Sequence, residues 1–141
     1  MLTREAVVAT AFSRRTLFDL HASVDGDKWR GNALLAVLAN APEYGGGLRI
    51  APTAELDDSW LNAAIVRSVS WSRFLRAIPI LLTSGNLQMQ ELERFRCKRF
   101  AIDAPSGTKV HGDGEILGES PVEFEIAPAA LRVMAPKPVR S

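Results

Sequence analysis

The sequence predicts a mainly β protein, an antiparallel β-sandwich with about two helices in a single domain that spans residues 1–141. Three observations predict this fold class. Apolar and polar residues alternate with a period of two in several short segments, Asp-Gly pairs typical of tight turns recur, and one longer segment is almost continuously apolar. A length of 141 residues suits one domain, and a hydrophobic content of 47% is enough to build a core.

The first part of the chain is expected to hold one short helix followed by strands. Residues Thr3–Arg15 predict the helix, with a threonine at its N-cap. Residues Phe18–Val24 alternate as a half-buried strand does, and Asp25-Gly26 supplies a hairpin turn. The apolar run Asn32–Ala41 predicts a strand buried on both faces, although its alanine and leucine content leaves a helix open.

The middle of the chain predicts a further strand, Asn62–Val69, and then the second helix. Ser70 could cap this helix, Pro79 should kink or shorten it, and Gly85 is a natural stop. Its apolar side consists of Trp71, Phe74, Leu75, Ile78, Leu81 and Leu82.

From Glu91 onward the period returns to two, but its parity changes once. Phe95 and Cys97 share one face, whereas the apolar positions after Lys98 are Phe100 and Ile102. Because a one-residue shift turns a strand over, we expect a β-bulge near Lys98-Arg99. Two late strands follow, at residues 122–126 and 131–133.

Charge and cysteine content exclude several classes of protein. The 17 basic and 16 acidic residues leave a net charge of +1, which argues against a nucleic-acid partner. A single cysteine, Cys97, cannot form an internal disulfide, and this fits a reducing cytoplasm. The run Ala77–Leu82 is far shorter than the roughly 20 residues of a membrane span. Arg14-Arg15 follow the N-terminal apolar stretch instead of preceding it, unlike a secretory signal. A cytoplasmic protein is expected.

Three short motifs could carry chemistry, and each also has an ordinary structural interpretation. Asp113-Gly114 is a common hairpin turn, or it projects Glu115 from a sheet rim to accept a proton from an alcohol attacking a phosphoryl group. Gly45–Gly47 is a tight turn, or it allows close approach to a phosphate, without the Lys-Ser or Lys-Thr of a P-loop. Asp57-Asp58 is an acidic turn, or it holds a structural Mg²⁺ or Ca²⁺.

A basic edge is the remaining feature, because Arg94, Arg96, Lys98 and Arg99 lie close together in the sequence. Such an edge is most often solvated, and it also protects a strand from aggregation. Together with the basic and aromatic residues of the second helix, it could instead meet an anionic membrane surface. The two histidines and Cys97 lack the spacing of a zinc site.

Five segments in a fixed order carry a family resemblance, and they are Ala39–Ala41, Tyr44–Pro52, Ala54–Asp58, Asp113–Gly118 and Ile126–Val133. Together they resemble the C-terminal domain of the bacterial diacylglycerol kinase and sphingosine kinase-like lipid kinases. The resemblance implies a β-sandwich next to an interdomain cleft, and transfer of the ATP γ-phosphate to a diacylglycerol-like lipid hydroxyl.

The resemblance also implies roles for single residues. Glu115 matches the general base, and Asp113 lies in the same turn. Asp58 matches a side-chain ligand of a structural Mg²⁺, to which Glu55 and Trp60 would give backbone carbonyls.

Two departures limit these expectations. Ser59 replaces the glycine that the family usually has after the aspartates, so the cation loop could differ. The Gly-Gly-Asp-Gly-Thr motif of the family's nucleotide-binding domain does not occur in these 141 residues. We therefore expect catalysis and ATP binding only with a nucleotide-binding domain in cis or in trans. The alternative is a non-catalytic β-sandwich that binds lipid, a membrane surface or a partner protein.

Overall fold

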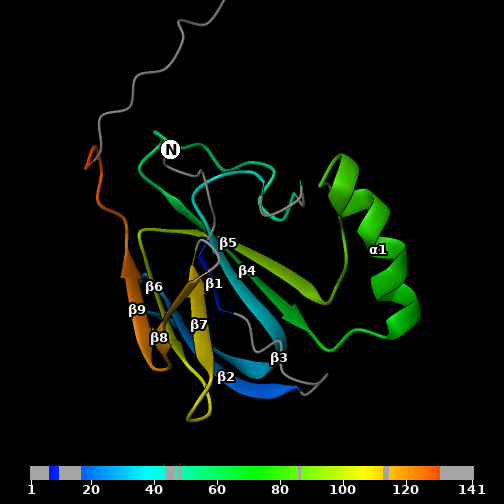
Figure 1. Cartoon of the computed structure of the whole chain (residues 1–141), viewed down its shortest axis with the longest axis horizontal. Coiled ribbons are helices and arrows are strands. Elements are labelled where there is room, and N and C mark those ends of the chain that lie inside the picture. Colours follow the sequence, from blue (N-terminus) through cyan, green and yellow to red (C-terminus); the bar gives the residue numbers. More distant parts are fainter. Residues whose placement is uncertain are drawn as a thin grey trace, which may run out of the picture.

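The computed structural model describes residues 7–9, 17–43, 47, 49–85, 87–112 and 115–130 of the chain. Within these residues it contains nine strands and one helix (Figure 1). The strands are β1 Val7–Ala9, β2 Phe18–Val24, β3 Asp27–Ala39, β4 Leu61–Arg67, β5 Leu92–Cys97, β6 Arg99–Asp103, β7 Lys109–Gly112, β8 Glu115–Glu119 and β9 Val122–Glu125. The helix, α1, spans Trp71–Thr83. The mainly antiparallel β architecture predicted from the sequence is confirmed.

The long strand β3 connects the two sides of the fold. The strands follow the order β8-β7-β1-β3-β2-β6-β9, and β4 and β5 join at β3. The first half of β3 pairs with β2, whereas its second half pairs with β1 and β4. Leu20 of β2 and Phe100 of β6 share one hydrophobic core with Ile65 of β4 and Cys97 of β5, and all four are fully buried. The core of the sandwich therefore lies between these two groups of strands.

The second half of β3 is buried on both faces, as its apolar run predicts. Leu38 belongs to the main core, while Val37 packs with Ala64 on the opposite face. Ala39 packs with Ala51 and Ala54 of the following loop. This second face is therefore covered by the loop that carries the predicted cation site.

The β-bulge predicted near Lys98-Arg99 is wrong: β5 ends at Cys97 and β6 begins at Arg99, so the change of parity marks the point where the chain passes from one group of strands to the other. β5 pairs with β4, whereas β6 pairs with β2 and β9. Asp25 of the β2–β3 turn joins the corner, since its Oδ1 accepts hydrogen bonds from the backbone N–H groups of Lys98 (2.8 Å) and Arg99 (2.7 Å). These donors hold the pKa of Asp25 below its ordinary value. Burial raises the pKa of the neighbouring Cys97 thiol to about 11, so this cysteine is a core residue and not a nucleophile.

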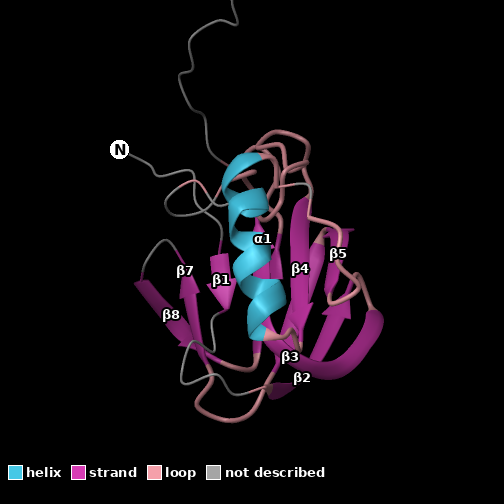
Figure 2. Cartoon of the chain, turned by 90° about the vertical axis from the view of Figure 1, so that its right-hand side faces the viewer, coloured by secondary structure: helices cyan, strands magenta, loops and turns pink. Residues whose placement is uncertain are grey.

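Helix α1 lies along one side of the strands (Figures 1 and 2). Ser70 is at its N-cap, although its side chain makes no capping hydrogen bond. The helix continues past Pro79 to Thr83, whose hydroxyl donates to the Pro79 carbonyl at 2.9 Å. The helix ends at Thr83, and Gly85 just beyond it has a φ of 66° and donates its N–H to the Ile80 carbonyl at 2.8 Å, which agrees with the stop predicted there. In the part of the chain that the structure describes, no helix is long and apolar enough to span a bilayer.

The helix predicted over Thr3–Arg15 is wrong at Val7–Ala9, which form β1. Val7 pairs with Leu38 of β3 on one side and with Gly112 of β7 on the other. The two valines of β1 favour this extended conformation, and a strand is needed there to join β3 to β7. The remainder of that segment lies outside the described residues, as does the late strand predicted at residues 131–133.

Candidate functional site

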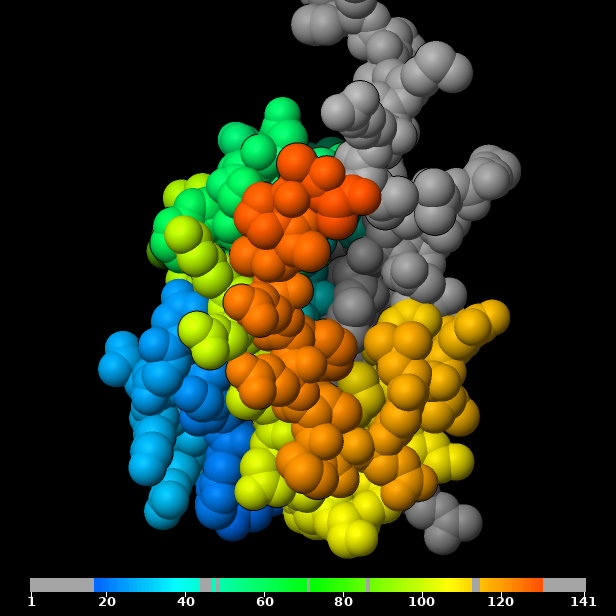
Figure 3. All heavy atoms as spheres, turned by 90° about the vertical axis from the view of Figure 1, so that its left-hand side faces the viewer, coloured from blue at the N-terminus to red at the C-terminus, as the bar shows by residue number. Residues whose placement is uncertain are grey.

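The β7–β8 hairpin places Glu115 at the first position of an edge strand. β7 and β8 pair antiparallel with Gly112 opposite Glu115, which confirms the predicted hairpin. Asp113, the second predicted catalytic residue, lies outside the described residues. The Glu115 side chain is exposed, and within the described residues its carboxylate has no hydrogen bond or ion pair. Figure 3 shows the hairpin (gold) at the surface next to β9 (orange).

Two aliphatic residues next to Glu115 are also unusually exposed. Ile116 is 57% exposed and Leu117 is 58% exposed. Leu117 nevertheless packs across the hairpin, because a Cβ on Gly112 would come within 2.5 Å of its Cδ1. Gly112 thus leaves the space that the Leu117 side chain occupies here. The hairpin holds a carboxylate and two aliphatic side chains together at one edge of the sheet.

The carboxylate of Asp58 has a different environment, because N–H donors hold both of its oxygens. Its Oδ1 accepts the backbone N–H of Trp60 at 2.9 Å, and its Oδ2 accepts Nη2 of Arg96 at 2.9 Å. The Asp58 side chain is only 10% exposed. The guanidinium of Arg96 lies 5.0 Å from the centroid of the Trp60 ring, and Nζ of Lys98 lies 5.1 Å from it. Asp58 therefore anchors a small cluster of cations over an indole.

Ser59 stands where the family usually has glycine, and it adopts a backbone conformation that is typical of glycine. Its φ is +59°, in the left-handed region that glycine adopts freely and other residues adopt at a cost. The backbone between Asp58 and Trp60 thus keeps a glycine-like turn. This conformation brings the Trp60 N–H to the Asp58 carboxylate.

The donors available to a cation at this loop are few. Asp58 is the one predicted side-chain ligand, and Glu55 points its exposed side chain to solvent. Within the described residues no three His, Cys, Asp or Glu side chains form a group that could hold a metal ion. Mg²⁺ prefers six oxygen ligands, and a carboxylate offers about four lone-pair positions. A cation could use the remaining lone pairs of Asp58, and it would compete with the positive charge of Arg96.

Two buried amide groups lie in the strands next to this loop. Asn62 of β4 pairs with Arg96 of β5 and with Ala39 of β3. Its Nδ2, and the Oδ1 of Asn40, are buried without a hydrogen-bond partner in the described structure. Unpaired buried polar atoms are rare in folded proteins. These two atoms show that the interior next to the loop is polar.

The structure does not bring the two predicted sites together along the sheet. Glu115 belongs to β8, whereas the partner of Asp58, Arg96, belongs to β5. The strands β7, β1, β3 and β4 lie between them in the pairing order. The catalytic and metal-binding predictions therefore concern separate regions.

The basic edge predicted from β5 is divided among different partners. Arg94 donates to three backbone carbonyls, those of Leu87 (2.8 Å), Gly85 (3.1 Å) and Ile50 (3.3 Å). Burial lowers the pKa of this guanidinium. Arg96 pairs with Asp58, so these two arginines do not form one free basic surface. Sequence alone could identify their shared face but not their partners, which come from distant loops.

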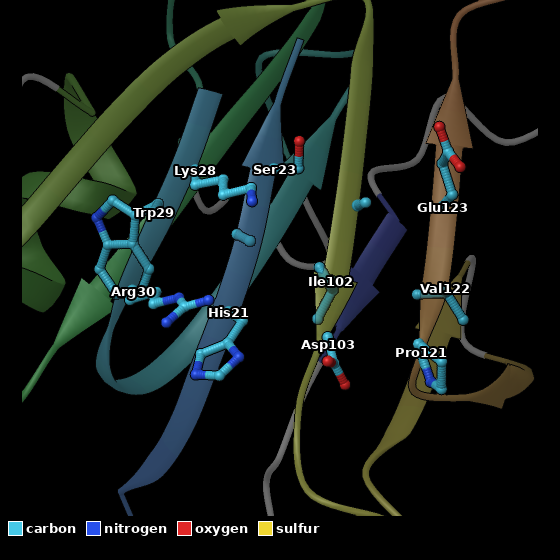
Figure 4. A pocket seen from close by; sticks show the side chains of 12 residues that line it. His21, Ser23, Lys28, Trp29, Arg30, Ile102, Asp103, Pro121, Val122 and Glu123 are labelled. Atoms are coloured by element: carbon cyan, nitrogen blue, oxygen red, sulfur yellow. The ribbon is translucent and has the colours of Figure 1, made fainter. Parts of the chain in front are cut away.

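A shallow groove of about 440 Å³ crosses β2, β3, β6 and β9 (Figure 4). Lys28 and Arg30 lie on one side of it, with Asp103 and Glu123 on the other. None of the residues predicted to form a site lines this groove. The opposite charges balance one another, so the groove favours neither an anion nor a cation.

Comparison with known proteins decides the family. Residues 5–135 match the family described as the YegS C-terminal NAD kinase beta sandwich-like domain. The chain belongs to this family. The resemblance to the C-terminal domain of lipid kinases that the sequence motifs indicate is confirmed.

The relatives of this domain are named as lipid kinases and are considerably longer. A diacylglycerol kinase of Mycobacterium tuberculosis is 33% identical over 103 residues, which cover 73% of this chain and 33% of that protein. A probable lipid kinase YegS-like protein of Pseudomonas savastanoi is 29% identical over 135 residues, covering 96% of this chain and 41% of that protein. The chain spans about a third of the first of these relatives.

The fold also agrees with that of a solved structure. A putative diacylglycerol kinase from Bacillus anthracis matches with a TM-score of 0.67 and 24% sequence identity. The match covers 82% of this chain and 40% of that one. It supports the β-sandwich architecture and says nothing further about activity.

Proposed function

We propose that this domain supplies the acceptor side of a lipid kinase, with Glu115 as the general base. The observation that carries this proposal is the exposed carboxylate of Glu115, which begins a hairpin strand and has no polar partner among the described residues. The lipid hydroxyl oxygen attacks the γ-phosphorus of ATP, and its proton passes to the Glu115 carboxylate. A new O–P bond forms while the bond between the γ-phosphorus and the bridging oxygen breaks, and ADP leaves.

The surroundings of Glu115 support a lipid as the acceptor. The exposed side chains of Ile116 and Leu117 follow it directly, so an apolar chain attached to the reacting hydroxyl would meet aliphatic surface. The names of the relatives point to the same substrate class, because they are called diacylglycerol kinase and lipid kinase. We propose a diacylglycerol-like lipid as the substrate.

ATP would be held by a nucleotide-binding domain, joined to this one in cis or in trans. Phosphoryl transfer depends on positioning ATP and neutralising its charge, and no phosphate-binding motif occurs in these 141 residues. Asp58 would hold a structural Mg²⁺ with the carbonyls of Glu55 and Trp60, where the ion would strengthen the loop. This role rests on the resemblance and on the Asp58 lone pairs that Arg96 and Trp60 leave free.

A chimeric enzyme tests the proposal. The N-terminal two-thirds of the Mycobacterium tuberculosis relative would be joined to this chain, and transfer of labelled γ-phosphate to diacylglycerol would be measured. We expect transfer by the chimera and none by the 141-residue chain alone. A folded chimera that binds ATP but phosphorylates no lipid would contradict the proposal, and so would turnover by the chain alone.

A further inference from the structure

The apolar side of helix α1 is wider than the part of the helix that the rest of the domain covers. Ala77 is buried, and Ile78 and Leu81 are half-buried. Leu75 and Leu82, however, remain 48% and 50% exposed. They are seven residues apart and therefore lie within about 20° of each other around the helix. Pro79, also exposed, extends the same side, and we call Leu75, Pro79 and Leu82 the outer stripe.

The charges around the outer stripe have a single sign. No acidic residue occurs between Ser68 and Gln90, and the two charged residues in that stretch are Arg73 and Arg76. Arg73 pairs with Glu91 of the following loop. Arg76 donates from Nε to the Ser72 carbonyl at 3.1 Å, and its positive charge has no acidic partner within the described residues.

The helix is held firmly although its outer stripe is uncovered. The Arg49 N–H donates to the Leu81 carbonyl at 2.8 Å, and Arg94 holds the Gly85 carbonyl at the end of the helix. A Cβ on Gly85 would come within 2.5 Å of Arg49, so the helix end and this loop are in close contact. The outer stripe therefore lies on a helix whose C-terminal end is held by the neighbouring loop and by β5. Figure 2 shows this helix in front of the strands.

We propose that the outer stripe of α1 docks on an anionic membrane surface. Aliphatic side chains on one side of a helix, a free arginine next to them and no acidic residue within the helix are features of a helix that lies in a membrane interface. Arg76 is that arginine, about 100° around the helix from Leu75, whereas Arg73 is about 160° away and paired with Glu91. The arginine stems can extend so that their heads reach lipid phosphates. A second copy of α1 fits the stripe less well, because it would bring like charges together.

This surface is narrower than the one that the sequence suggested, which joined the basic edge to Arg73, Arg76 and Trp71 of α1. The arginines of β5 are occupied by Asp58 and by backbone carbonyls, so α1 and not the basic edge presents the apolar contact. The inference is independent of Glu115, since it concerns attachment to the membrane and not proton transfer. If the proposed function holds, this contact keeps the domain at the membrane, where its lipid substrate resides.

Vesicle flotation of the 141-residue chain tests this surface. The chain would be mixed with vesicles of phosphatidylcholine, with or without phosphatidylglycerol, and the bound fraction measured. We expect binding that is stronger with phosphatidylglycerol. The double variant Leu75→Gln/Leu82→Gln should lower the partition coefficient by at least about tenfold, because two leucines no longer leave water. Arg76→Gln should lower it by about fivefold on anionic vesicles only.

Ile80→Gln provides the matched control. Ile80 is 39% exposed, but it lies about 140° around the helix from Leu75. The control should bind as the wild type does, and melting curves would show that all variants fold. Absence of binding to anionic vesicles, or an equal loss in Ile80→Gln, would overturn the proposal. It would also be overturned if the double variant kept its vesicle binding and lost instead a dimer, or a complex with a nucleotide-binding domain.

Discussion

The carboxylates of Asp58 and Glu115 show how differently one small domain can use the same chemical group. Asp58 is nearly buried, and N–H donors from Trp60 and Arg96 hold both of its oxygens at 2.9 Å. Glu115 is exposed at a sheet edge and has no polar partner within the described residues. A carboxylate that accepts hydrogen bonds from the surrounding protein stabilises the fold, whereas an exposed carboxylate without such donors is available to accept a proton. The difference separates the structural role of Asp58 from the catalytic role that we propose for Glu115.

The largest expected effect belongs to Glu115. In the chimeric kinase, Glu115→Gln should lower turnover by roughly two to four orders of magnitude, because the amide keeps the size of the side chain and cannot accept the proton. Its free energy of unfolding should change by less than about 0.5 kcal/mol, since the side chain is exposed. Phosphorylation assays and melting curves measure the two quantities. Near-normal turnover in a folded variant would mean that Glu115 is only a turn residue.

Asp58→Ala should show the opposite pattern. Removing the carboxylate leaves the Trp60 N–H without its acceptor in a partly buried place, and it breaks the pair with Arg96. We expect a loss of about 1–3 kcal/mol in the free energy of unfolding, measured in urea. Most of this comes from the hydrogen bonds, because Arg96 is 57% exposed and its ion pair is weak. Unchanged stability would show that the cluster does not hold the loop.

Arg96→Met would sharpen the magnesium proposal. Methionine keeps apolar contact with the Trp60 ring but removes the cation that competes for Oδ2 of Asp58. Added Mg²⁺ should therefore stabilise the variant more than it stabilises the wild type. At ten times the variant's Kd for Mg²⁺, the variant should gain about 1.4 kcal/mol. Melting curves with and without Mg²⁺ measure this, and the double variant with Asp58→Ala is the control. Equal responses in all three proteins would rule out a cation at Asp58.

Ser59→Gly tests the conformation of the same loop with a smaller effect. Glycine adopts the left-handed φ of +59° without the steric cost that serine has there. We expect the variant to be more stable by about 0.5–1 kcal/mol, after the larger entropy of the unfolded glycine chain is subtracted. Urea unfolding measures this difference. A destabilised variant would indicate that the serine side chain makes a contribution of its own.

Asp25 is a second structural carboxylate, and its contribution should depend on pH. Its folded pKa lies below the ordinary value of 3.8, so its contribution is complete above that value and is lost as the pH falls through the lowered pKa. Asp25→Asn keeps an acceptor oxygen and tolerates the φ of 50°, and it removes the charge. The variant should melt below the wild type near neutral pH, and the difference should shrink in acid. A gap that is independent of pH would contradict this assignment.

The alternation of apolar and polar residues along the chain predicted most of the strands, because alternate residues of a half-buried strand face the core. The alternation of Phe18–Val24 and of Val122–Glu125 reappears as alternating burial in β2 and β9, and Asp25-Gly26 forms a turn between the paired strands β2 and β3. The change of parity at Lys98 marks a real break in pairing and not the expected β-bulge. Pattern was wrong at Val7–Ala9, where pairing with β3 and β7 overrode the helical pattern of a short segment.

The sequence by itself determined the fold class, the family and the position of Glu115 in a hairpin, since these depend on short segments and their order. Only the tertiary structure decided which charged groups meet. Asp58 is 38 residues from Arg96, and Arg94 binds the Ile50 carbonyl 44 residues away. Such contacts depend on the register of β4 and β5 and on the course of loops that no local periodicity records. The uncovered side of α1 is likewise a tertiary result, because exposure depends on what the rest of the chain leaves unpacked.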